Sequence, residues 1–192
     1  FDRYTEWIQK WTLMRLNAYS NVGKSKFSYQ IVNKLLEQDA HVVYFSLEVQ
    51  KLQMIYNLMA NKFWKKIQEL YSLDIDTLDM GQLFSKKLEI VTDKYELDEI
   101  IWYASMRKPD VVVIDFVQNI RWKWDEYERM TDIAIRLQQF AIKNNIAIFD
   151  MSQVSNEWAK SMNTDIIPSK WSGALVASAD VALMMNRSKV DE

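Results

Sequence analysis

The chain has 192 residues, of which 49% are hydrophobic, and its formal net charge is −2. This length and composition predict one globular domain over residues 1–192 and exclude a surface that is basic all over, although a local basic site is compatible with them. Cysteine is absent and histidine occurs once, which excludes disulfides, thiolate metal sites and clusters of histidine ligands. No stretch of 18 residues is uninterruptedly apolar and no signal-peptide pattern opens the chain, so we expect a cytoplasmic protein without membrane contact.

Hydrophobic periodicity predicts that strands and helices alternate along the chain. Strands are expected at 12–17, 41–47, 88–91, 111–116, 146–151 and 181–185, and helices at 24–37, 51–70, 97–107 and 128–144. The segment 71–87 is less regular, with a short helix near 80–86. Alternation of this kind predicts an α/β fold, a mostly parallel twisted sheet with helices on both faces, and a ligand at the carboxyl ends of the strands.

The connection between the first strand and the first helix is typical of a phosphate-binding loop. It matches G-x-x-x-x-G-K-S/T except that Ala18 stands at the first glycine, a position that alanine can occupy unless the backbone needs a positive φ. A strand that turns tightly into a helix directs backbone N–H groups and the helix N-terminus at one point. The alternative is a lysine-capped turn that happens to contain Gly-Lys-Ser. The residues predicted to contact the nucleotide are Ala18, Ser20, Asn21, Val22, Gly23, Lys24, Ser25 and Lys26.

Within this loop, Lys24 is expected to reach the β- and γ-phosphates, and the Ser25 hydroxyl to hold Mg²⁺. A second motif downstream supports this interpretation. The β-branched run 111–114 ends in Asp115, and a strand that is apolar on both faces belongs in the middle of a parallel sheet. Asp115 would lie beside the loop and orient Mg²⁺. The alternative is an ordinary strand followed by an Asp cap, but the two motifs together favour a nucleotide site.

Two further polar residues follow predicted strands. Glu48 comes after the second strand, where a carboxylate can polarise the water that attacks the γ-phosphorus. Its alternative role is that of an acid at a helix N-terminus. Gln153 comes after the fifth strand, where its amide can hydrogen-bond a γ-phosphate; its alternative role is that of a polar loop residue.

A cationic and aromatic stretch follows the strand that ends in Asp115. Arg121 and Lys123 alternate with Trp122 and Trp124, a combination that can hold a nucleic-acid backbone while the bases stack. The same residue types are enriched in subunit interfaces, so both interpretations stay open here.

Five motifs in this order resemble the motor domain of DnaB-type replicative helicases, within the RecA-like superfamily. They are the phosphate loop, Phe-Ser-Leu-Glu at 45–48, Val-Ile-Asp-Phe-Val-Gln at 113–118, Met-Ser-Gln at 151–153, and Ser-Gly at 172–173 followed by Ala-Asp-Val at 179–181. The resemblance extends from about residue 4 to residue 187.

The resemblance implies an ATP-hydrolysing motor that assembles as a homo-oligomer, a hexameric ring, moves on single-stranded DNA and works with other replication proteins. It implies that Lys24 and Ser25 bind phosphate and Mg²⁺, that Asp115 supports the metal, that Glu48 activates water and that Gln153 senses the γ-phosphate. It also implies that Lys170 and Gly173 approach DNA.

The chain departs from the family pattern at Ala18, and neither Arg187 nor Lys189 matches the basic finger that completes a neighbouring active site. We therefore expect the chain to lack the family's last strands and its amino-terminal helical domain. One alternative is a KaiC- or RadA-like ATPase in recombination, clock or signalling work. Another is a degenerate loader or scaffold that no longer hydrolyses nucleotide, which the presence of Lys24, Glu48 and Asp115 disfavours.

Overall fold

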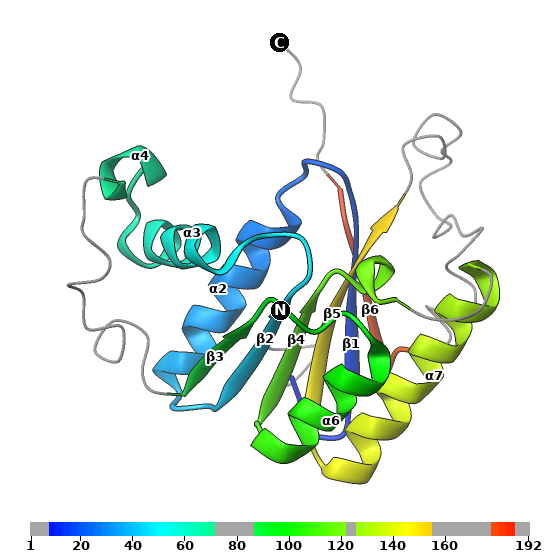
Figure 1. Ribbon diagram of the computed structural model, residues 1–192. Coiled ribbons are helices and arrows are strands. Elements are labelled where there is room, and N and C mark those ends of the chain that lie inside the picture. Colours follow the sequence, from blue (N-terminus) through cyan, green and yellow to red (C-terminus); the bar gives the residue numbers. More distant parts are fainter. Residues whose placement is uncertain (1–7, 72–86, 122–125, 155–177, 187–192) are drawn as a thin grey trace.

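The computed structural model describes residues 8–71, 87–121, 126–154 and 178–186. Within them, six strands form one sheet with the order β3-β2-β4-β5-β1-β6, and every neighbouring pair is parallel (Figure 1). The strands are β1 (Leu13–Tyr19), β2 (Val42–Ser46), β3 (Leu88–Val91), β4 (Val111–Asp115), β5 (Ala147–Val154) and β6 (Val181–Met185). The predicted α/β class and parallel sheet are thereby confirmed.

Helices cover both faces of the sheet. They are α2 (Lys24–Glu37), α3 (Lys51–Phe63), α4 (Ile67–Leu70), α6 (Leu97–Arg107) and α7 (Glu126–Asn144), with a 3-10 turn, η2 (Val117–Asn119), directly after β4. Side chains alternate between the two faces along each strand, which divides the core. On one face Phe45 and Ile114 pack with α6 and α7, and on the other Tyr44 and Val113 pack with α2 and α3. None of the described helices is long and apolar enough to cross a bilayer.

Most predicted elements are found, but the helix expected at 51–70 is broken. α3 ends at Phe63, and Trp64 adopts a left-handed conformation with φ 54°. The N–H groups of Trp64 and Lys65 both donate to the Ala60 carbonyl, which closes the helix before α4 begins. The short helix expected near 80–86 lies outside the described residues.

Strand β5 extends three residues beyond its predicted end at Met151. The extension pairs with β1 up to Tyr19↔Val154, and β1 itself runs two residues past its predicted end at Asn17. The two strands therefore lengthen together, and they carry the phosphate-loop entry and Gln153 to the same edge of the sheet.

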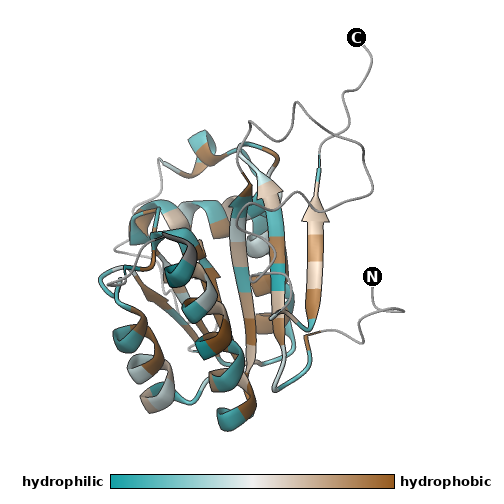
Figure 2. Ribbon diagram, turned by 90° about the vertical axis from the view of Figure 1, so that its right-hand side faces the viewer, coloured by the Kyte–Doolittle hydropathy of each residue, from teal (hydrophilic) through white to brown (hydrophobic). Residues whose placement is uncertain are grey.

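The sheet also contains a fully buried ion pair. Arg15 of β1 and Asp150 of β5 are register partners, and both side chains have no exposed surface. The guanidinium makes two contacts with the carboxylate: Nε donates to Oδ1 over 2.7 Å, and Nη2 donates to Oδ2. Polar positions of this kind are visible as hydrophilic bands within the strands in Figure 2. The pair satisfies two charges that would otherwise be costly to bury.

We predict that Arg15→Met lowers the free energy of unfolding by about 3–5 kcal/mol, because it leaves the Asp150 carboxylate buried without its cation. The double variant Arg15→Met/Asp150→Leu should recover most of that loss. Urea unfolding of both variants measures the difference. A single variant within about 1 kcal/mol of the wild type would show that the pair does not anchor β1 to β5.

Candidate functional site

The carboxyl ends of four strands meet at one edge of the sheet, and β1 leads there into the loop before α2. Gly23 caps α2 in a left-handed conformation with φ 105°, which an L side chain rarely adopts. Its carbonyl accepts the Phe27 N–H over 3.0 Å, so the helix begins directly after the turn. Ala18, in contrast, lies inside β1 in extended backbone, fully buried between β5 and β6, and it does not line the cavity described below. The backbone at Ala18 therefore does not require a positive φ, and an alanine fits where the family pattern has glycine. The contact of Ala18 with the nucleotide stays a prediction.

A cavity of about 530 Å³ opens over this loop. Its lining is formed by the loop and by two other strand ends: Tyr19, Ser20, Asn21, Val22, Gly23, Lys24, Ser25, Lys26, Glu48 and Gln153. All the predicted loop residues except Ala18 are thus brought together with both Glu48 and Gln153. The α2 N-terminus faces the cavity with no acidic residue in its first turn, so its unpaired N–H groups and positive dipole end favour an anion.

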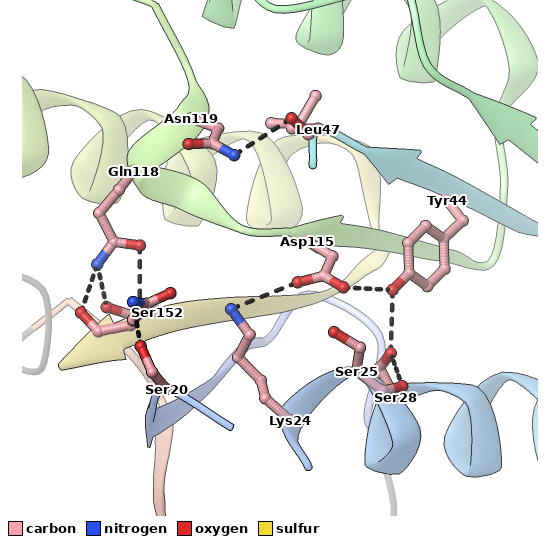
Figure 3. A network of polar contacts seen from close by, with 11 residues as sticks. Ser20, Lys24, Ser25, Ser28, Tyr44, Leu47, Asp115, Gln118, Asn119 and Ser152 are labelled. Carbon is pink, nitrogen blue, oxygen red and sulfur yellow. Dashed lines mark hydrogen bonds and ion pairs between the residues drawn. The ribbon is translucent and has the colours of Figure 1, made fainter. Parts of the chain in front are cut away.

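Lys24 is held between the loop and the end of β4. Its Nζ lies 3.5 Å from Asp115 Oδ1 (Figure 3). The same atom lies 4.0 Å from the centre of the Phe116 ring. Burial lowers the pKa of Lys24 below the ordinary lysine value, and the negative charges of Asp115 and Glu48 act in the opposite direction. Both Lys24 Nζ and Asp115 Oδ1 are buried without a hydrogen-bond partner among the described residues. A cation donor and a carboxylate oxygen that are both unsatisfied suit a ligand carrying phosphate oxygens and a metal ion.

The other carboxylate oxygen of Asp115 is fixed by a hydroxyl relay. Tyr44 donates to Asp115 Oδ2 over 3.1 Å, and its hydroxyl also lies 3.0 Å from Ser28 Oγ. Burial raises the pKa of Tyr44 well above its ordinary value, so the phenol stays protonated as a donor. Ser28 Oγ also lies 2.8 Å from the Ser25 carbonyl oxygen, so the single Ser28 hydroxyl proton is donated either to that carbonyl or to the Tyr44 oxygen. The relay therefore ties the predicted metal carboxylate to the first turn of α2, which carries Ser25 (Figure 3).

Glu48 follows β2 and is exposed at the cavity wall. It does not belong to a helix, since α3 begins only at Lys51. The backbone before it is fixed to β4, because the Leu47 N–H donates to the Asp115 carbonyl over 2.9 Å. An exposed carboxylate on a fixed backbone, facing a loop that suits phosphate, is placed to act on water.

Gln153 reaches the loop from β5. Its Nε2 donates to Ser20 Oγ over 2.6 Å, so the amide already lies against the phosphate loop. Sequence reasoning missed the residues that hold this region, namely Tyr44, Ser28, Gln118 and Asn119. Only Gln118 belonged to a recognised motif, and nothing in the sequence indicated its partners.

The residues predicted to contact nucleic acid are placed only in part. Arg121 is exposed, and its guanidinium carbon lies 5.0 Å from the centre of the Tyr95 ring. The backbone N–H of Arg121 donates to the Tyr95 carbonyl. Lys123, Lys170 and Gly173 lie outside the described residues.

Residues 1–192 match the DnaB-like helicase C terminal domain over the whole chain. The chain belongs to this family. It is a DnaB-like motor domain, within the ATPase and helicase class of enzymes, and nucleotide and metal use are general properties of such domains.

Solved structures share the fold. One is an ATPase domain, 19% identical, with a TM-score of 0.84 and alignment over 100% of this chain and 76% of that chain. Another is a DnaB-like replicative helicase described with its interactions with primase, 19% identical, with a TM-score of 0.83, covering 97% of this chain and 50% of that chain. The DnaB-like motor domain therefore spans about half the length of that helicase. No curated protein shows a significant sequence match.

Proposed function

We propose that the chain hydrolyses Mg-ATP in the cavity over the phosphate loop and uses the energy to move along single-stranded DNA as one subunit of a hexameric ring. The observation that carries the proposal is the convergence of Lys24, Glu48, Asp115 and Gln153 at one edge of the sheet, around a loop whose helix N-terminus favours an anion.

In the proposed complex, backbone N–H groups of the loop hold the β-phosphate and Lys24 Nζ moves from Asp115 to the β- and γ-phosphate oxygens. Ser25 Oγ and Asp115 would hold Mg²⁺, Asp115 being oriented by Tyr44. When bound, Mg²⁺ supplies charge neutralisation at the phosphate oxygens. Lys24 Nζ and Asp115 Oδ1 are buried and have no hydrogen-bond partner among the described residues, so phosphate oxygens and a metal ion would supply the partners that these two atoms lack.

Glu48 is the proposed acceptor of the proton from the attacking water. Its carboxylate is exposed at the cavity wall, on the side of the loop that adjoins β2. Gln153 is the proposed donor to the γ-phosphate, because its amide already donates to Ser20 in the same loop. The two residues approach from strands on opposite sides of β4.

Single-stranded DNA is the proposed substrate of movement, with Arg121, Lys123, Lys170 and Gly173 as contacts. Support comes from the family and from the exposed cation at Arg121. Other replication proteins are proposed partners, since a similar helicase is described with its interactions with primase. Family membership favours this function over a KaiC- or RadA-like role. A domain without hydrolysis is disfavoured by the presence of Lys24 and Glu48 at the cavity, with Asp115 paired to Lys24.

We predict that Lys24→Ala abolishes Mg-ATP binding, because it removes the cation that faces the phosphates. Calorimetric titration of the complete protein with Mg-ATP measures the change. Lys34→Ala is the matched control: Lys34 lies in the same helix, is exposed and pairs with Glu37 on the surface, so affinity should be unchanged. Equal affinity of the Lys24 variant and the wild type would contradict the proposed site.

We predict that Glu48→Gln binds Mg-ATP normally while turnover falls by about 10²–10⁴-fold, the range typical of removing a general base. The amide keeps the size of the side chain but does not accept a proton from water. Steady-state phosphate release measures turnover, and Glu37→Gln, at an exposed position in α2, is the control. Unchanged turnover in assembled protein would assign water activation to another residue.

A further inference from the structure

The carboxyl end of β5 pairs with a neighbouring strand on one side only. On the β4 side the pairing stops at Ile114↔Asp150, whereas on the β1 side it continues to Tyr19↔Val154. Gln153 therefore lies in a stretch that the sheet supports from one side only. Strand backbone in this situation leaves N–H and C=O groups without a ladder partner.

The side chain of Gln118 occupies the place of the missing strand. Gln118 belongs to η2, directly after β4. Its Oε1 accepts the Gln153 N–H over 3.2 Å, and its Nε2 donates to the Gln153 carbonyl over 3.0 Å and to Ser152 Oγ over 2.8 Å (Figure 3). A carboxamide has an acceptor oxygen and an N–H donor, like the peptide groups of a neighbouring strand, and it has one further N–H donor. It can therefore pair with both backbone groups of Gln153 at once.

The stretch of β5 around Gln153 is consequently held on both sides: it pairs with β1, where Ala18 is the register partner of Gln153, and Gln118 bonds both backbone groups of Gln153 on the other side. Its side chain leaves this fixed backbone toward the loop and donates to Ser20 Oγ over 2.6 Å. The next residue of the turn, Asn119, donates to the Leu47 carbonyl over 3.2 Å, immediately before Glu48. Residues of η2 thus hydrogen-bond both the end of β5, which carries Gln153, and the residue that precedes Glu48 after β2.

We propose that Gln118 is a positioning residue for hydrolysis: by completing the backbone pairing of Gln153, it fixes the distance between the Gln153 amide and the phosphate loop. The inference rests on the proposed function of the cavity. Its physical basis is that a displacement of about 1 Å in a group that meets the reacting phosphate can cost about 10²-fold in rate. Gln118 does not line the cavity, so it acts through Gln153.

The test uses the complete, assembled protein and two readouts. The first is kcat and KM for Mg-ATP, and the second is the ratio of the affinities for a slowly hydrolysed triphosphate analogue (ATPγS) and for ADP. Gln118→Met keeps the length of the side chain and removes its donors and acceptor, and Gln118→Glu keeps acceptors but loses both donors. Gln139→Met, at an exposed position in α7, is the matched control.

We expect Gln118→Met to lower kcat by about 10–100-fold with little change in KM, and to reduce the preference for the triphosphate over ADP. A merely structural role would lower the thermal midpoint without changing that preference. In a Gln153→Ala background, Gln118→Met should have no additional effect on kcat, since residues that act as one unit are not additive.

Unchanged kcat and an unchanged affinity ratio in folded Gln118→Met would overturn the inference, as would an equal loss of kcat with and without Gln153. If Gln118→Met does not fold, Gln118→Glu and Ser152→Ala decide. The larger effect is expected for Gln118→Glu, because it removes the donor to the Gln153 carbonyl, whereas Ser152→Ala leaves that bond in place. Failure of the proposed function has a different signature, namely normal Mg-ATP binding by Lys24→Ala.

Discussion

The parallel alignment of β1, β5, β4 and β2 is the constraint on which the rest of the structure depends. Because all four strands run the same way, their carboxyl ends reach one edge of the sheet and deliver the phosphate loop, Gln153, Asp115 and Glu48 to the same place. The buried pair of Arg15 and Asp150 fixes the register between β1 and β5, and the core on both faces keeps the strands in line.

Electrostatics at that edge then suit a polyphosphate with its metal ion. Burial disfavours the charged form of Lys24, whereas Asp115 and Glu48 favour it. Phosphate oxygens close to Nζ would act in the same direction as these carboxylates, so in the proposed complex a bound triphosphate would stabilise the charged form of Lys24. The hydroxyl of Tyr44 fixes Asp115 from the opposite side, which leaves one carboxylate oxygen directed at Lys24. The site is therefore organised by the fold before a ligand arrives.

The sequence predicted the bounds of those helices and strands whose ends are determined by neighbouring residues in the chain. The helix 97–107 came out at its predicted bounds, since Glu96 and Glu99 form a capping box at its start and Pro109 follows its end. The break at Trp64 was missed because neither Gly nor Pro marks it and the apolar period continues to Leu70. The length of β5 and the bonds of Gln118 depend on neighbouring strands that are distant in sequence, so no local pattern could indicate them. Among the predicted site residues, Lys24, Glu48 and Gln153 reach the cavity, whereas Ala18 is a strand residue.

We propose that nucleotide chemistry at this edge of the sheet serves movement on DNA. The most direct measurement is the rate of ATP hydrolysis by the complete, assembled protein with and without single-stranded DNA. A motor of this family should hydrolyse ATP alone and do so faster when single-stranded DNA is present, with the stimulation weakening as salt is raised. A rate that is the same with and without DNA, in protein that binds Mg-ATP and is assembled, would contradict the motor function.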